Sequence, residues 1–385
     1  MRTVISFILF LTVFFTLYGS LHYYLYRKLT RALTLPWPYQ ALILVFFLLM
    51  LFAPVLVNLL ARQGSHLLAT FLGYIGYTWM GALFLFFSIH LLIDVYQGIA
   101  HLLSKSSLQV LTALNPGNKV SFWFAVLLSM GIIIYGSFEA KNIKIETLTL
   151  KTNKLPPEVK SLRIVQISDI HFSLINGPGL ARKIVERIDA LAPDILISTG
   201  DLTDRGLNET NGVEELFKGL KAPYGKYAVT GNHEFYTGIK EAIAFTEAAG
   251  FRMLRNEGLE VAGLVNIVGV DDPAGKRFGL DAHISESDIL GKFSNDKLTL
   301  LLKHRPMLSE KSKGLFDLQL SGHLHKGQIF PFSLITSLLF RYHDGLFKLE
   351  GHSHIYVSRG TGTWGPPVRF LSFPEITLIE FQRTK

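Results

Sequence analysis

The 385-residue chain contains no cysteine, so disulfide bonds and thiolate metal ligands are both excluded. Any metal ion that it binds must be held by histidine, aspartate, asparagine or glutamate. The sequence also lacks internal repeats, low-complexity tails, and the aromatic and basic patterns or helix-turn-helix signals of nucleic-acid-binding proteins. We therefore expect no nucleic-acid partner. The absence of cysteine fits either side of a membrane and does not identify a compartment.

Acidic residues are fewer than basic ones, and the net charge is +8. This excess fits a membrane protein whose lysines and arginines flank its helices. An alternative is a basic surface that attracts anionic lipid or a phosphate-bearing substrate.

Charged residues are scarce before residue 140, where four long apolar runs lie at residues 4–24, 39–60, 67–93 and 120–138. About 20 apolar residues are enough to cross the hydrocarbon core of a bilayer, so each run predicts a membrane-spanning helix. Aromatic residues near the ends of the runs fit an interfacial belt. We predict a transmembrane helical domain over residues 1–140 and a second domain over residues 141–385.

Two features of the helical segment have alternative interpretations. The first run is a spanning helix or a cleaved signal peptide, although it is long for the latter and lacks a clear cleavage site. Asp94 is an interfacial residue or a buried functional carboxylate.

Basic residues are more frequent in the loops after the first and third runs than in the loop after the second, which has only Arg62. If the more basic loops face the cytoplasm, the second domain lies outside the cytoplasmic membrane.

The second domain has the pattern of an α/β protein. Short apolar runs predict strands near residues 143–150, 162–167, 194–198, 227–230, 265–270, 298–302 and 318–320. Helical patterns at residues 180–191 and 239–249 lie between some of them. Alternating strands and helices indicate sheets that are covered by helices.

Side chains that bind metals follow five of these strands, at the strand ends where α/β folds place their ligand sites. The five segments are Asp169-Ile170-His171, Gly200-Asp201-Leu202-Thr203-Asp204, Gly231-Asn232-His233-Glu234, His304 and Gly322-His323-Leu324-His325. Each segment alone is common as a capping turn or surface pair, but all five at strand ends are not expected by chance. Two divalent ions can clamp a phosphoryl group and generate hydroxide, and they need a bridging carboxylate and neutral imidazoles. Glycines beside these residues allow close approach of the backbone.

In this order the segments resemble the calcineurin-like metallophosphoesterases, over about residues 145–382. The stretches at residues 357–370 and 374–376 look like the bacterial membrane-anchored branch of that superfamily. The resemblance implies a domain of two mixed β-sheets sandwiched by helices. It also implies a multi-pass protein of the bacterial cytoplasmic membrane, whose substrates in some relatives are lipid-linked phosphates.

The resemblance further implies a role for each residue. The first metal would be held by Asp169, His171 and His325, the second by Asn232, His304 and His323, and Asp201 would bridge them. His233 would contact the phosphate and protonate the leaving oxygen, and Asp204 would orient His233. Arg205 would either contact the phosphate or be a surface residue. The ions would be Mn, Fe or Zn. Glu234 is expected to be structural, whereas Asp271 and Asp272 either line the pocket or do not contribute.

One departure from the family pattern is Lys326, which follows the last metal-binding histidine where many relatives have glycine. It either adds positive charge beside an anionic substrate or points to solvent. The apolar segment at residues 329–340 is too short to span a bilayer. It either covers the sheet or forms an apolar lip that admits a lipid tail.

We therefore predict a two-metal hydrolase at the membrane surface, in which a metal-bridging hydroxide attacks phosphorus in line. The expected partners are membrane lipid and a phosphorylated or pyrophosphorylated lipid or envelope precursor. Alternatives are a hydrolase of soluble phosphoesters, a non-catalytic receptor for phosphorylated ligands, and a transport role for the helical block.

Overall fold

The computed structural model describes residues 2–103, 115–204, 212–280 and 284–384. The chain forms two compact units. The first comprises Met1–Phe138 with Gly365–Val368, and the second comprises Glu139–Trp364 with Arg369–Lys385. We describe each unit by itself.

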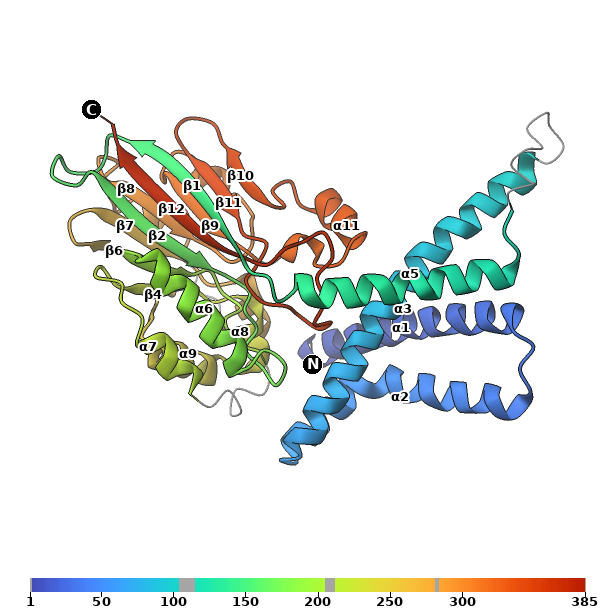
Figure 1. The fold of residues 1–385 in the computed structure, drawn as a ribbon. Coiled ribbons are helices and arrows are strands. Elements are labelled where there is room, and N and C mark those ends of the chain that lie inside the picture. The colour runs from blue at the N-terminus through green and yellow to red at the C-terminus, as the bar shows by residue number, and fades with distance from the viewer. Residues whose placement is uncertain (1, 104–114, 205–211, 281–283, 385) are drawn as a thin grey trace. The chain divides into compact units, whose positions relative to one another are not determined.

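The first unit is helical. It contains α1 (Arg2–Ala32), α2 (Trp37–Arg62), α3 (His66–Leu103) and most of α5 (Asn118–Glu139), and Figure 1 labels all four helices. Within the described part of the chain, α2, α3 and α5 are long and apolar enough to cross a membrane. They cover three of the four apolar runs. The run at residues 4–24 lies in α1, and its passage through a membrane stays a prediction.

Asp94 connects two helices of this unit. The Lys28 ammonium on α1 lies 2.6 Å from Asp94 Oδ1 on α3, and the Tyr24 hydroxyl donates a hydrogen bond of 2.6 Å to Oδ2. An unpaired carboxylate among apolar helices is costly, so these partners stabilise the charge and fix α1 against α3. Asp94 thus has a structural role, whatever else it does.

Two six-stranded sheets form the second unit. In the first sheet the order is β1 (Lys144–Thr152), β12 (Glu375–Arg383), β2 (Ser161–Ile167), β3 (Ile195–Ser198), β4 (Lys226–Ala228) and β5 (Arg252–Met253). In the second it is β10 (Gly345–Lys348), β11 (His354–Val357), β9 (Leu318–Ser321), β8 (Leu298–Leu302), β7 (Val265–Gly269) and β6 (Glu257–Val261). Both sheets mix parallel and antiparallel pairs, which confirms the predicted fold class.

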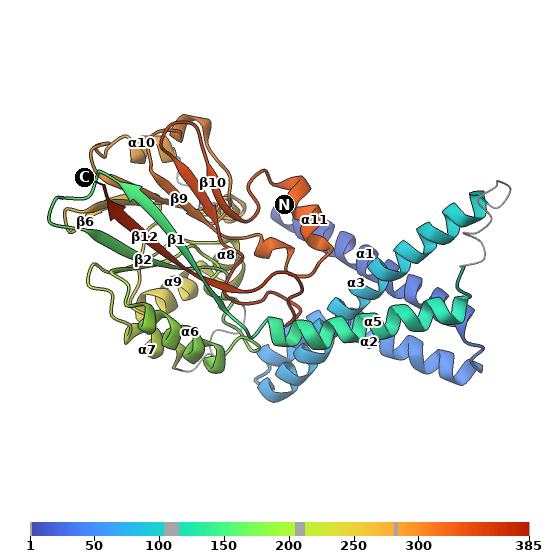
Figure 2. The ribbon, with the colours of Figure 1, turned by 45° about the horizontal axis from the view of Figure 1, so that its top comes forward.

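Alternate side chains of the strands build the layers of this unit. Ile164 of β2 and Leu300 of β8 lie in the core between the sheets, whereas Val165 points to the other face of its sheet. Figure 1 shows that this other face is covered by α6 (Pro178–Leu191), α7 (Val213–Lys218) and α9 (Ile239–Ala248). Figure 2 shows α10 (Glu286–Leu290), which packs on the outer face of the second sheet. A side-chain period of two therefore separates three apolar layers.

The strand directions bring the metal-type residues together. β2, β3 and β4 are parallel neighbours in the first sheet, and β7, β8 and β9 are parallel neighbours in the second. The carboxyl ends of parallel neighbours lie at one edge of a sheet, and such edges carry ligand sites. All five predicted segments follow the ends of these strands.

We predict that Ile164→Ala destabilises the second unit by about 2–5 kcal/mol, because the side chain is fully buried between the two sheets and its loss leaves a cavity. The full chain in detergent should become protease-sensitive at a lower urea concentration. Lys151→Ala, at an exposed position of β1, is the control and should leave the midpoint unchanged. Equal midpoints for both variants would contradict this description of the core.

Candidate metal centre

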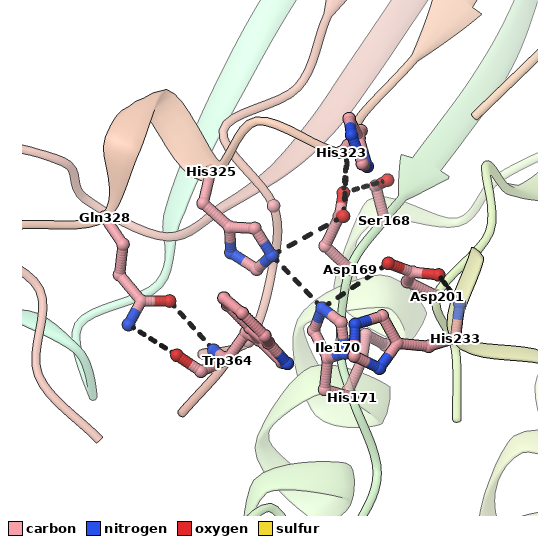
Figure 3. A network of polar contacts seen from close by, with 12 residues as sticks. Ser168, Asp169, Ile170, His171, Asp201, His233, His323, His325, Gln328 and Trp364 are labelled. Atoms are coloured by element: carbon pink, nitrogen blue, oxygen red, sulfur yellow. Dashed lines mark hydrogen bonds and ion pairs between the residues drawn. The ribbon is translucent and has the colours of Figure 1, made fainter. Parts of the chain in front are cut away.

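Loops from both sheets bring their imidazoles and carboxylates into one buried site (Figure 3). Among the described residues, three groups have ligand atoms that lie within 4.8 Å of one another, and two of them consist of predicted metal ligands alone. One group is Asp169, His171 and His325, and the other is Asp201, His304 and His323. These are six of the seven predicted metal ligands, so the structure brings together residues that are up to 156 positions apart (325 − 169).

The distances within each group place nitrogen atoms face to face. His171 Nε2 lies 3.1 Å from His325 Nε2, and His304 Nε2 lies 3.1 Å from His323 Nδ1. Asp201 Oδ2 lies 3.2 Å from His304 Nε2 and 3.8 Å from His171 Nε2. One carboxylate oxygen is therefore close to both groups, as a bridging ligand must be.

The seventh predicted ligand, Asn232, has an unsatisfied side-chain acceptor, which supports this assignment. Among the described residues, the buried Asn232 amide oxygen has no hydrogen-bond partner. A buried acceptor without a partner is costly unless something else satisfies it. Asn232 begins α8 (Asn232–Thr237), and the next residue donates its N–H to Asp201 Oδ1 at 2.8 Å. The amide oxygen is thus an available ligand beside Asp201.

Burial keeps most of these imidazoles neutral, which is the form that binds metals. Burial lowers the pKa of His171 to about 4 and that of His323 to about 3, and neighbouring cationic groups add to both shifts. Burial also holds the pKa of His325 well below its usual range, and the Arg369 charge contributes. The donor set fits a binuclear centre of divalent ions that accept nitrogen and oxygen ligands.

His304 differs from the other imidazoles. Burial lowers its pKa, but the Asp201 charge and hydrogen bond outweigh burial and raise the pKa to about 10. His304 Nε2 lies 3.2 Å from Asp201 Oδ2, so without metal a proton on this imidazole is favoured, and metal binding must displace it. The set of ligands remains compatible with metal, because a divalent ion more than replaces the positive charge of the displaced proton.

The backbone at the site is strained. Asp169, His171, Asp201, His323 and His325 all have positive φ, between 47° and 76°. Residues with side chains rarely adopt this left-handed region, and such outliers gather at functional sites where surrounding structure holds them. Five of the seven predicted ligands share it. This observation is independent of the sequence motifs and supports a functional site.

Two glycines have no room for a side chain beside the carboxylates. A Cβ added to Gly231 would overlap the carboxylate of Asp201, and one added to Gly322 would overlap that of Asp169 and the Ser168 hydroxyl. The glycines of the predicted G-N-H-E and G-H-x-H segments are therefore required by close approach.

The Glu234 carboxylate holds the backbone of the two loops that carry Asp201 and Asn232. Its carboxylate accepts hydrogen bonds from the backbone N–H groups of Asp201, Leu202, Thr203 and Gly231, at 2.7–3.2 Å. One buried side chain therefore fixes the loop after β3 against the start of α8, which is a structural task.

His233 lies beside the two groups and is held by Asp204. His233 Nδ1 lies 3.1 Å from Asp204 Oδ1, and the rings of Tyr236 and Trp364 contact the imidazole edge-on, with centroids 5.5 Å and 5.6 Å away. Burial lowers the pKa of His233, but the charges of Asp201 and Asp204 outweigh it and raise the pKa to about 9. A cationic imidazole can donate a proton. His233 also forms the third group with His171 and Asp201, whose ligand atoms lie within 4.8 Å of its own.

The other residues singled out in the sequence either pair with an oppositely charged side chain or lie outside the described part of the chain. Arg205 lies outside the described residues. The Lys326 ammonium lies 3.0 Å from Asp344 Oδ2, so an acidic neighbour already balances its charge. Asp271 pairs with Arg255 at 2.7 Å, and Asp272 pairs with Arg305 at 2.7 Å.

Sequence reasoning assigned no role to three residues that shape the site. The buried Arg369 side chain donates to the carbonyls of Gly360 and Gly362 and lies 3.2 Å from His325 Nδ1. Gln328 makes two hydrogen bonds to the backbone of Trp364, at 2.8 Å and 2.9 Å, and so fixes the indole near His233 (Figure 3). Their positions gave a hint in the sequence, because all three residues fall in or beside the segments that resemble the family. Their contacts were not evident without the fold.

The comparison with known families agrees with this geometry. Residues 162–327 match the family of calcineurin-like phosphoesterases. An uncharacterized metallophosphoesterase of Aquifex aeolicus is 36% identical over 250 residues, which covers 64% of this chain and 94% of the relative. The chain therefore belongs to the calcineurin-like phosphoesterase family, and with its His/Asp metal site it is a metallophosphoesterase.

Two further relatives bear on the membrane segment. The match to the first spans nearly the whole chain, and the second is described as a transmembrane protein. An uncharacterized metallophosphoesterase of Campylobacter jejuni is 28% identical over 390 residues, covering 98% of this chain and 100% of the relative. A protein of Danio rerio described as a transmembrane protein with metallophosphoesterase domain is 29% identical over 267 residues, covering 66% of this chain and 61% of its own.

We predict that Gly322→Ala lowers the metal content of the purified full-length protein, because the added methyl group displaces the Asp169 carboxylate. Inductively coupled plasma mass spectrometry should show a loss of about half of the bound divalent metal or more. Gly179→Ala is the matched control, since a Cβ at this position of α6 meets no atom within 4 Å. Full metal content in Gly322→Ala would contradict the assignment.

Proposed function

We propose that this protein hydrolyses the phosphoester or pyrophosphate headgroup of a membrane amphiphile, such as a phosphorylated lipid or envelope precursor. The observation that carries the proposal is the buried site in which Asp201 is close to two groups of metal ligands beside the His233–Asp204 pair. Divalent ions bound there would stabilise negative charge on the phosphoryl oxygens and lower the pKa of water.

The chain's own residues account for departure of the leaving group. Hydrolysis adds water to phosphorus and breaks the bond to the leaving oxygen, which must then accept a proton. Asp204 engages His233 through Nδ1, so Nε2 remains for proton transfer. Tyr236 and Trp364 flank the imidazole and limit the access of water to it. His233 is accordingly the general acid and Asp204 its positioning residue.

A membrane substrate is supported by the helices of the same chain. Three described helices are long and apolar enough to span a bilayer, so the catalytic unit is tethered close to lipid. The excess of basic residues favours anionic headgroups. Soluble phosphoesters are the alternative substrates. A receptor without catalysis is disfavoured, because the predicted metal ligands are all present in the sequence.

We also propose that the protein belongs to the bacterial membrane-anchored branch, as a multi-pass protein of the cytoplasmic membrane with its catalytic unit outside the cytoplasm. The distribution of basic residues between the loops supports this orientation. Membrane lipid and the phosphoester substrate are the partners that this location requires.

We predict a shift in the pH profile of Asp204→Asn. The Asp204 charge helps to raise the pKa of His233, and a general acid is active only while protonated, so activity falls as the pH rises through this pKa. Loss of the charge lowers the pKa and should move the alkaline limb of kcat to lower pH. An unshifted alkaline limb would remove His233 as the general acid. Asp317→Asn, at an acidic residue paired with Lys154, is the control.

We predict that His233→Ala lowers kcat by about 10²–10⁴-fold, which is the usual contribution of general acid catalysis.

Asp201→Asn should lower both activity and metal content, because it removes the charge shared by the two groups. The assay uses a series of phosphomonoesters, phosphodiesters and pyrophosphates with long and short alkyl chains. Retained activity in Asp201→Asn would contradict the bridging role, and equal turnover of long-chain and short-chain substrates would remove the lipid hypothesis.

A further inference from the structure

An exposed apolar surface of the catalytic unit lies on α11 (Phe332–Leu339), shortly after the predicted ligands His323 and His325. The helix consists of Phe, Ser, Leu, Ile and Thr and carries no charge. Leu338 is 86% exposed, Leu339 72%, Leu334 54% and Ile335 46%. Contiguous exposed aliphatic side chains of this kind mark an interaction surface.

This surface is continuous with the metal centre. Phe340 ends α11, and its ring centroid lies 6.2 Å from that of His323. The segment before the helix is fixed as well, because the Phe330 N–H donates to the Phe370 carbonyl and Gln328 bonds to Trp364. Phe340 therefore connects the predicted ligand His323 with the exposed leucines at the end of α11.

Charges border α11 without entering it. Between Lys326 and Arg341 the chain has no acidic or basic residue. Arg341 follows the helix and is exposed, whereas the Lys326 charge is balanced by Asp344. A short apolar helix with a basic residue at its end suits the boundary between acyl chains and anionic headgroups.

We propose that α11 lies in the outer part of the bilayer and that the acyl chain of the substrate follows it to the metal centre. With eight residues the helix is too short to span the bilayer, for which about 20 are needed, so it lies in the interface. Lipid is favoured over a protein partner because the exposed residues of the helix are chiefly aliphatic. Leucine, serine and threonine, which are under-represented among the residues that dominate the energy of protein interfaces, make up most of α11, and tryptophan, tyrosine and arginine are absent from it. The path of the acyl chain rests on the function proposed above, whereas insertion of α11 does not.

The absence of cysteine makes insertion directly testable. Leu338→Cys in the full-length chain is labelled with a polarity-sensitive fluorophore and reconstituted into vesicles of phosphatidylcholine and phosphatidylglycerol, with and without spin-labelled lipid. We expect blue-shifted emission that falls by about half or more with the spin-labelled lipid. Lys292→Cys, at an exposed polar position of the same unit, is the control and should show neither effect.

Two results would overturn the proposal. A label at position 338 that is as water-exposed as the control means that nothing covers α11. A blue-shifted label that spin-labelled lipid does not quench means that protein covers it instead.

Substrate entry is tested with two probes that share one leaving group, methyl p-nitrophenyl phosphate and hexadecyl p-nitrophenyl phosphate. For Leu338→Asp we expect about tenfold lower kcat/KM on the hexadecyl probe and little change on the methyl probe. Equal losses on both probes would overturn the path along α11. If the unmodified protein hydrolyses neither probe nor any substrate of the wider series, the proposed function fails, while lipid quenching still decides the insertion of α11.

Discussion

The structure depends on the burial of charged and ionisable ligands at one place. Asp169 and Asp201 are buried together with His171, His304 and His325, and removing such groups from water is costly unless charge and hydrogen bonds compensate. Burial raises the pKa of Asp169 to about 6, and the nearby Asp201 charge adds to the shift, so a negative charge on Asp169 is disfavoured without a compensating cation. Cations remove this conflict. The sheets, the strained loops and the glycines hold the ligands close together in a geometry that suits divalent cations.

The loops that carry the ligands are held by different means in the two sheets. In the first sheet, Glu234 fastens the loop after β3 to the start of α8 through four backbone N–H groups. In the second, the loop after β9 is anchored by His323 N–H, which donates to Asp169, and by Arg369 beside His325. Left-handed backbone at five ligands persists because these contacts hold it. The loop after β9 leads into α11, and Gln328 in the same stretch fixes Trp364 near the site, so apolar side chains lie close to the ligands.

Much of the fold was accessible from the sequence, for reasons that individual elements make clear. β2, β3 and β8 are short buried strands whose apolar runs end in polar residues, and the predicted ranges agree closely with the observed bounds. Elements with few residues were missed. β5 has two residues and β6 alternates weakly, so neither carries a period that identifies it. β12 was missed because its place between β1 and β2 depends on pairing with strands more than 200 positions earlier, as in Thr377 with Gln166 (377 − 166 = 211).

Residue types and their order determined the class of chemistry, because only certain side chains bind divalent ions and they follow buried strands in a fixed succession. The sequence by itself also determined that α2, α3 and α5 are apolar enough for a membrane, since that property needs composition and length alone. Tertiary structure decided which oxygen of Asp201 is close to both groups, that Glu234 is a structural acceptor and Asn232 an unsatisfied one, and that α11 faces outward. These properties depend on distances between segments far apart in the chain, and local pattern does not encode such distances.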